Sequence, residues 1–266
     1  RAQIVQWECG TYLDKVSKGE HPMALLGWTG DNGDPDNFLY VLLDLAAAQI
    51  SNRDTRGARA TIARLRALRE PFVEDPRIDL LEARVLRGQP GGRAAAERAV
   101  AKGKALAAHQ LVARARFAEG AQHWDTPEIE RAIPAFEEAL RLWRLSGDRV
   151  GESQALRQIA FARFRAGDVA RARAELEALV ATLPAGDLPA ARLDAVDFLA
   201  SLEREQLALA RARELHLEAA GLAELLGVPD SAAAHRGWAG SVLFFAGDLA
   251  GARRELESAR ARLEEL

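Results

Sequence analysis

The sequence predicts a mainly α-helical protein, a right-handed superhelix of stacked helical hairpins with a short N-terminal α/β fragment. From residue 45 onward the chain is dominated by Ala, Leu, Arg and Glu, which are strong helix formers. A short pattern recurs there at separations close to multiples of 38–40 residues, a period typical of stacked helical hairpins. Residues 1–44 differ, because they hold the only Cys, the only Met and both Tyr, but just one of the 32 Arg.

The N-terminal residues predict several short elements instead of one long helix. Apolar and β-branched residues favour strands at 4–7 and 23–26. A helix is expected between them at 10–17, where the apolar residues share one face. The segment 27–34 holds three glycines, so it is expected to form a tight acidic loop. Asp34 precedes a proline and is expected to cap the next helix.

Apolar residues continue with helical spacing across the composition break between Asp44 and Leu45. They run as Phe38, Val41, Leu42 and Leu45, and Gln49 follows in the same register. This spacing predicts a single helix that spans the break and serves as the first helix of the first hairpin. The hairpin turn is expected at Arg53 and Asp54.

The charge balance of both parts excludes one class of partner. Residues 1–44 carry three basic and seven acidic residues, a net charge of −4, and the remainder has a net charge of +1. Nucleic-acid binding requires a strong positive balance, so we expect no nucleic-acid partner. No apolar run reaches the ~20 residues that span a bilayer. The start at Arg1 and the composition break together favour a truncated or mis-joined reading frame.

Three segments of the helical part share a pattern that predicts the start of a helix. In each, Asp is followed by Ala and Arg at the fourth and fifth positions and by Ile or Leu at the eighth, at 54–62, 168–176 and 248–256. A capping Asp then precedes a helix whose small and large residues share one face. Two copies follow Ala-Gly, where Gly is expected to end the preceding helix.

The repeating unit resembles the tetratricopeptide repeat. In its clearest copy the packing positions of the two helices are Leu156, Ile159, Ala160, Arg163, Ala172, Leu176 and Leu179, closed by Pro184. Two further copies use Gly240, Leu243, Ala252, Leu256 and Ala259, and Gly120, Ala132, Phe136 and Ala139. Pro134 is expected to kink or delay its helix, and 75–107 and 190–227 are expected to form less regular pairs.

The resemblance implies a partner groove, because the first helices of such repeats line the concave surface. The residues placed there are Gln154, Arg157, Phe161, Phe164, Arg165 and Phe244. Arginines interleaved with aromatic residues suit a protein or peptide partner that is acidic or presents its C-terminal carboxylate. The alternative, which we favour, is that the Phe residues seal contacts between hairpins while the Arg residues are solvated.

Neither a metal site nor a catalytic set is expected from the sequence. His109, His123, His216 and His235 are scattered, with no second ligand three or four positions on and no partner Cys. We interpret them as surface or packing residues. Without a Gly-rich phosphate loop or a nucleophile motif, the sequence favours a protein that is not an enzyme and needs no cofactor.

A second resemblance is confined to the N-terminal fragment. The segment 27–38 is similar to the C-terminal part of the dipeptide- and oligopeptide-binding proteins of ABC importers. The resemblance implies that Asp31 pairs with the α-amino group of a peptide, and that the pocket is lined by Trp28, Thr29 and Gly30. Such a charge-assisted contact is strong in a desolvated cleft. The alternative is that these acidic residues cap turns.

The two parts, 1–44 and 39–266, predict different functions. The repeat array predicts a cytoplasmic interaction scaffold that resembles the sensor regions of bacterial regulators. The N-terminal fragment indicates a substrate-binding protein of a dipeptide or oligopeptide importer, a family that works in the periplasm or outside the cell. Because those proteins bind between two lobes that this chain lacks, we expect no useful dipeptide affinity.

Overall fold

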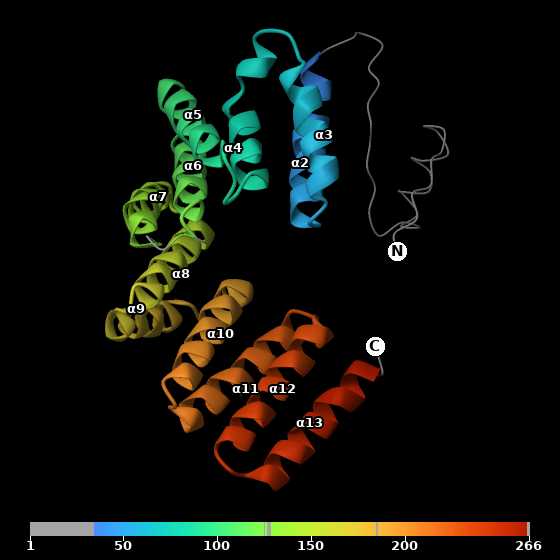
Figure 1. Cartoon of the computed structure of the whole chain (residues 1–266), viewed down its shortest axis with the longest axis vertical. Helices are drawn as coiled ribbons and strands as arrows, with labels where there is room; N and C mark the ends of the chain where they lie inside the picture. The colour runs from blue at the N-terminus through green and yellow to red at the C-terminus, as the bar shows by residue number, and fades with distance from the viewer. Residues whose placement is uncertain (1–34, 125, 127–128, 185, 265–266) are drawn as a thin grey trace.

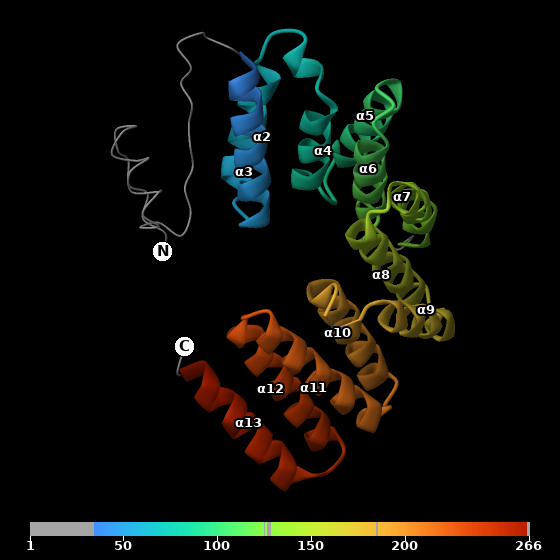
Figure 2. The ribbon, with the colours of Figure 1, turned by 180° about the vertical axis from the view of Figure 1, so that it is seen from behind.

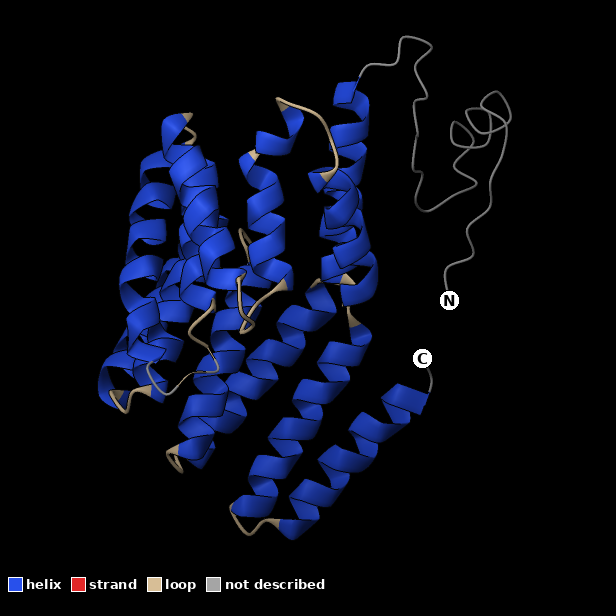
Figure 3. Ribbon diagram, turned by 45° about the horizontal axis from the view of Figure 1, so that its top comes forward, coloured by secondary structure: helices blue, strands red, loops and turns tan. Residues whose placement is uncertain are grey.

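The computed structural model describes residues 35–124, 126, 129–184 and 186–264. These residues form twelve α-helices and two 3₁₀ turns, without a strand among them (Figure 3). The helices are α2 (Pro35–Ser51), α3 (Thr55–Arg66), α4 (Pro76–Val85), α5 (Gly92–Ala105), α6 (His109–Ala121), α7 (Ala132–Ser146), α8 (Arg149–Arg165), α9 (Val169–Thr182), α10 (Pro189–Glu205), α11 (Leu209–Leu225), α12 (Pro229–Phe245) and α13 (Leu249–Glu264). The predicted N-terminal strands lie outside the described residues.

The helices stack in chain order into an open arc. Each helix from α4 to α13 packs on the next one along the chain, and α2 and α13 lie at the two ends of the stack (Figures 1 and 2). Helices α4, α8 and α10 lie nearer the open side of the arc than α5, α7 and α9 do (Figure 1). The predicted superhelix of helical hairpins is confirmed.

The repeat has a constant length over most of the chain. Helices α6, α8, α10 and α12 begin at His109, Arg149, Pro189 and Pro229, so these hairpins recur at one constant interval. That interval is longer than the tetratricopeptide unit of about 34 residues. The first helices α8, α10 and α12 are correspondingly long, with 17 residues each. Residues that share a place in this interval are therefore equivalent in neighbouring hairpins.

The hairpin of α6 and α7 shows why small residues stand at the predicted packing positions. Phe136 of α7 is fully buried, and a Cβ added at Gly120 of α6 would lie 2.6 Å from its ring. Glycine is therefore needed for the two helices to approach as they do. Pro134 lies in the first turn of α7, where a missing N–H breaks no helical hydrogen bond. Helix α7 therefore begins before Pro134 and continues through it to Ser146.

Helix α2 crosses the composition break in one piece, as predicted, but its buried face differs from the expected one. The side chains packed against its neighbours are Leu39, Leu42, Leu43 and Ala46. Val41 and Leu45, which the spacing placed on the apolar face, are exposed. Leu39, Leu43 and Ala46 follow the i, i+4, i+7 spacing of a packed helix face, so the helix is turned toward them.

The Asp residues of the repeated pattern cap their helices as predicted. The carboxylate of Asp248 accepts a hydrogen bond of 2.8 Å from the N–H of Gly251, and that of Asp168 accepts one of 3.3 Å from Arg171. A Cβ at residue 251 would clash with the Asp248 carboxylate. Glycine at this position therefore permits the shorter bond. Gly167 and Gly247 precede these caps with φ of 91° and 84°, the left-handed conformation that ends a helix.

Replacing Asp248 with Ala is expected to lower the free energy of unfolding by about 1 kcal/mol, because the first turn of α13 loses its cap. Asp168→Ala should cost less, since its bond is longer. Urea denaturation followed by far-UV circular dichroism checks both variants. An equal or larger loss in Asp168→Ala would contradict the link between bond length and cap strength.

A buried carboxylate joins the first two hairpins. Asp79 of α4 is fully buried, with Arg98 Nε 2.8 Å and Lys102 Nζ 2.9 Å from its oxygens and Arg66 of α3 also paired to it. Burial alone would raise the pKa of Asp79, but the hydrogen bonds from Arg66, Lys102 and Arg98 outweigh it and hold that pKa below its ordinary value. The ion cluster therefore ties α3, α4 and α5 together.

Candidate functional site

The six residues predicted to line a partner groove lie at three places, on α8 and α12. Gln154 and Arg157 lie in the first half of α8. Phe161, Phe164 and Arg165 lie at its end, and Phe244 lies at the end of α12. Gln154 and Arg157 line one small cavity of about 210 Å³. Phe244 lies apart from them at the end of α12, where its side chain is 57% exposed.

Phe161 and Phe164 belong to a row of aromatic side chains that runs between hairpins. The ring of Phe161 stacks on Trp124 at 4.9 Å between centroids and lies 5.7 Å from Phe198. Phe164 meets the same Phe198 edge to face at 6.1 Å, and the Arg165 guanidinium lies 5.9 Å from the centroid of Phe161. This arrangement supports the alternative that these Phe residues seal hairpin contacts.

A much larger groove lies on the first helices of the first four hairpins. It has a volume of about 860 Å³ and is lined by α4 and α6, by the end of α2 and by the start of α8. We call it the inner groove. Gln154 lies at its α8 end, so one predicted residue borders both cavities.

Four arginines line the inner groove, one from the turn after α2, one at the end of α4, one from the turn after α4 and one from α6. They are Arg53, Arg84, Arg87 and Arg114. All four are exposed, and within the described part of the chain none of them forms an ion pair. The groove walls lower the pKa of Arg84 by desolvation, and the charge of Arg114 lowers it further. Asp148, an acidic residue in this lining, is engaged as the cap of α8.

The wall between α4 and α6 is fixed by a buried amide. Gln122 Nε2 donates to the carbonyl oxygens of Ala83 at 2.9 Å and Ala118 at 3.1 Å, and its Oε1 accepts from the Gly88 N–H at 3.2 Å. Apolar side chains of the lining include Leu80, Val85, Phe117 and Trp143. The lining of the groove therefore combines apolar side chains with four positively charged arginines.

Three arginines of the inner groove, Arg53, Arg84 and Arg87, lie in the first two hairpins, which precede the constant interval, and the sequence analysis did not predict them. Helix α4 is short, with 10 residues. It begins at Pro76, which is closer to the start of α6 at His109 than the constant interval of the later hairpins allows. Its residues therefore fall outside the register set by the clearest copies. The spacing of Arg84 and Arg87 suggests one helix face, but α4 ends at Val85 and Arg87 lies in the turn after it.

The prediction that the histidines are scattered is wrong for His216 and His235. Their rings stack with centroids 6.0 Å apart, because α11 and α12 are neighbours in the stack. The structure places both of them near Asp197 of α10. The signal lay in the constant register of the hairpins, since the segment 208–216 aligns with the repeated pattern and has His216 where the other copies have Leu or Ile.

The residues of the N-terminal motif, Trp28, Thr29, Gly30 and Asp31, lie outside the described residues, as does Asp34. Their roles in binding the amino end of a peptide stay predictions.

Comparison with curated proteins confirms a resemblance over a short segment only. No known protein-family model matches the chain. It is 51% identical over 49 residues to the dipeptide-binding protein of Escherichia coli (strain K12), which covers 18% of this chain and 9% of that protein. It is 55% identical over 42 residues to di/tripeptide-binding protein 3 of Pseudomonas aeruginosa (strain UCBPP-PA14), 16% and 8% of the two chains. The chain thus spans less than a tenth of the length of these relatives.

Comparison with solved structures confirms the fold of the array. The apo form of RapI superposes with a TM-score of 0.60 at 12% identity, over 86% of this chain and all of that chain. NprR in complex with its cognate peptide NprX gives 0.58 at 13% identity, over 94% and 71% of the two chains. The array is thus a superhelix of tetratricopeptide-like hairpins. None of its described helices is long and apolar enough to cross a bilayer.

Proposed function

We propose that the array is a non-catalytic interaction scaffold that binds an acidic segment of a protein partner in the inner groove. The observation that carries this proposal is the set of four exposed arginines without ion-pair partners among the described residues, above an apolar floor. A cytoplasmic sensor region of a bacterial regulator is the setting that suits such an array.

The chemistry of the groove favours carboxylates over other ligands. Arg84 and Arg114 repel each other, so an anion placed between them relieves that repulsion and gains charge-assisted hydrogen bonds. Guanidinium groups bind carboxylates in a bidentate manner, while the side chains of Phe117 and Trp143 offer apolar contacts for a neighbouring residue. The fold shared with NprR, which was solved with a peptide bound, supports a peptide as the occupant.

Binding of labelled peptides to the full chain tests the proposal. We expect fluorescence anisotropy to show binding of a Glu- and Leu-containing peptide and none of the same peptide with Lys in place of Glu. The double variant Arg84→Ala, Arg114→Ala should bind the acidic peptide roughly 100-fold more weakly or worse, because it loses two charge-assisted hydrogen bonds that contribute about 1.5–3 kcal/mol each. Raising the salt concentration should weaken the wild-type complex.

A matched control uses two arginines on the last helix. Arg253 and Arg260 of α13 are exposed and pair with Glu257 and Glu264 four residues on, so their double Ala variant should bind like wild type. The pair Arg157→Ala, Arg165→Ala separates the two candidate surfaces. If that pair abolished binding while Arg84→Ala, Arg114→Ala had no effect, the partner would sit at the α8 residues and the inner groove would be ruled out.

A second candidate function rests on the short match to peptide-binding proteins. We propose that residues 1–44 are a peptide-binding-protein fragment that shares residues 39–44 with the array at 39–266, and that Asp31 of this fragment would bind the amino end of a peptide. Fewer than a tenth of the residues of those relatives are represented, so the fragment alone should bind dipeptides poorly. Calorimetry with a dipeptide checks this, and micromolar affinity that is lost in Asp31→Asn would establish the importer function instead.

A further inference from the structure

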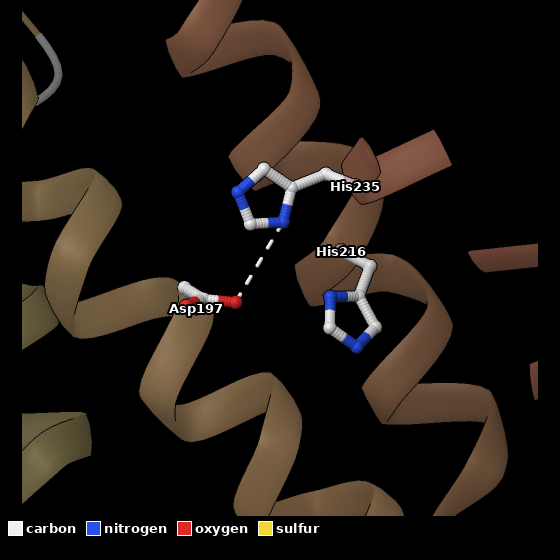
Figure 4. Close-up of side chains that lie close together, drawn as sticks. All are labelled: Asp197, His216 and His235. Atoms are coloured by element: carbon white, nitrogen blue, oxygen red, sulfur yellow. Dashed lines mark ion pairs between the residues drawn. The ribbon is translucent and has the colours of Figure 1, made fainter. Parts of the chain in front are cut away.

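Three side chains with metal-binding chemistry meet between α10, α11 and α12. They are Asp197, His216 and His235, which we call the histidine cluster (Figure 4). One potential ligand atom of each residue lies within 4.8 Å of those of the other two. Nδ1 of His235 is 3.6 Å from Oδ1 of Asp197, and both side chains point toward the space beside the His216 ring (Figure 4).

Both histidines replace apolar residues of the repeat. His216 is equivalent to Leu176 in the preceding hairpin, which is fully buried. His235 is equivalent to Ala155 and Ala195, which are also fully buried. The chain thus has histidine in place of an apolar core residue at two positions of its repeat, and the two histidine rings lie side by side.

The packing of the array does not satisfy the ring nitrogens of these histidines. His216 is 1% exposed, and neither of its nitrogens has a hydrogen-bond partner within the described residues. Leaving such buried groups unpaired is destabilising, whereas Leu at the equivalent position leaves no polar group unpaired.

We propose that the histidine cluster is a binding site for a divalent transition-metal ion of the Zn²⁺ class. Two imidazole nitrogens and one carboxylate oxygen are a donor set that suits Zn²⁺, Co²⁺ or Ni²⁺ and not Mg²⁺ or Ca²⁺. Ligand atoms within 4.8 Å of one another reach a common ion after small side-chain rotations. Three protein ligands leave a fourth position for water or for a group of a partner.

The charges around the site are compatible with a bound cation. Asp194 lies one turn before Asp197 and adds negative charge, whereas Arg157 and Arg204 add positive charge. The Arg204 guanidinium lies 4.8 Å from the ring centroid of Trp238, so it is engaged on that ring. The Asp197 side chain is about half exposed, which gives an ion a path to the site from solvent.

The competing explanation is that the two rings are packing residues. His216 stacks on both His235 and Trp238, and such stacked aromatic pairs are stabilising. That explanation accounts for the ring planes but not for three potential ligand atoms that lie within 4.8 Å of one another while buried ring nitrogens stay unpaired among the described residues. The two explanations differ in whether a metal ion binds.

Metal titration of the tag-free full chain, stripped with a chelator, tests the proposal. We expect calorimetry to show one Zn²⁺ bound per chain, and Co²⁺ to give the visible absorption bands of a four-coordinate site. The variant His216→Leu, His235→Ala restores the residues of the neighbouring repeats, so it should fold at least as well as wild type. It should bind Zn²⁺ roughly 100-fold more weakly or not at all, because two of three ligands are gone.

Two further variants complete the design. Asp197→Asn should weaken Zn²⁺ binding and change the Co²⁺ spectrum, whereas His109→Ala, which removes an exposed histidine at the start of α6, should bind like wild type. Circular dichroism confirms that each variant is folded. Absence of stoichiometric binding by wild type, or unchanged binding by His216→Leu, His235→Ala, would overturn the proposal and leave the rings as packing residues.

Discussion

Replacing Phe136 with Ala is expected to lower the free energy of unfolding by about 4 kcal/mol, the usual cost of emptying a buried aromatic position. Phe136 is fully buried at the centre of the largest core cluster. Its ring lies 5.2 Å from that of Phe117, which in turn lies 5.5 Å from Trp143. The variant therefore removes contacts on α6 and α7 at once. Urea denaturation followed by circular dichroism measures the loss.

A matched control and a double variant separate cavity formation from a general effect of losing an aromatic ring. Phe245→Ala removes a side chain that is 63% exposed and should cost less than about 1 kcal/mol. Gly120→Ala alone should destabilise the protein, because its Cβ would lie 2.6 Å from the Phe136 ring. Combined with Phe136→Ala it should cost less than the sum, since the methyl group then enters the cavity. Additive losses would contradict the packing described for this hairpin.

The repeat architecture could be predicted because one local pattern encodes it. Asp168 and Asp248 cap helices through contacts only three positions away, so capping depends on neighbouring sequence alone. Ala172 and Ala252 hold the same place in two copies of the pattern, and both are buried against the helix before them. Such features are visible in a single sequence because repeats contact only their neighbours.

The candidate sites could not be predicted in the same way, since they depend on which helices face each other. His216 lies on α11 and His235 on α12, in different hairpins, so no short spacing relates them. Arg84 and Arg114 likewise lie near each other only because α4 and α6, the first helices of two successive hairpins, are neighbours in the stack. The constant register of the later hairpins, applied to every position, would have revealed the pair of histidines but not the pair of arginines, because Arg84 lies on α4, which precedes the constant interval.

Replacing Asp79 with Asn is expected to lower the free energy of unfolding by about 3 kcal/mol, because it removes the buried partner of three cations. Arg66, Arg98 and Lys102 keep about a quarter to a half of their side chains exposed, so water and Glu82 offset part of the loss. That places the cost at the low end for a broken buried ion pair. Glu97→Gln, which breaks an exposed pair with Arg93, is the control and should cost less than about 0.5 kcal/mol.

The same variant should show a defined dependence on pH. The folded state holds the pKa of Asp79 below its ordinary value, so its stabilising effect is complete above the unfolded pKa of about 3.9 and is lost as the pH falls below it. The difference in unfolding free energy between wild type and Asp79→Asn should therefore be constant from pH 7 to about 5 and shrink below about 4. Denaturation curves at several pH values measure it. A difference that grew on acidification would mean that Asp79 is not stabilised as a carboxylate, and the ion cluster could not be what joins the first two hairpins.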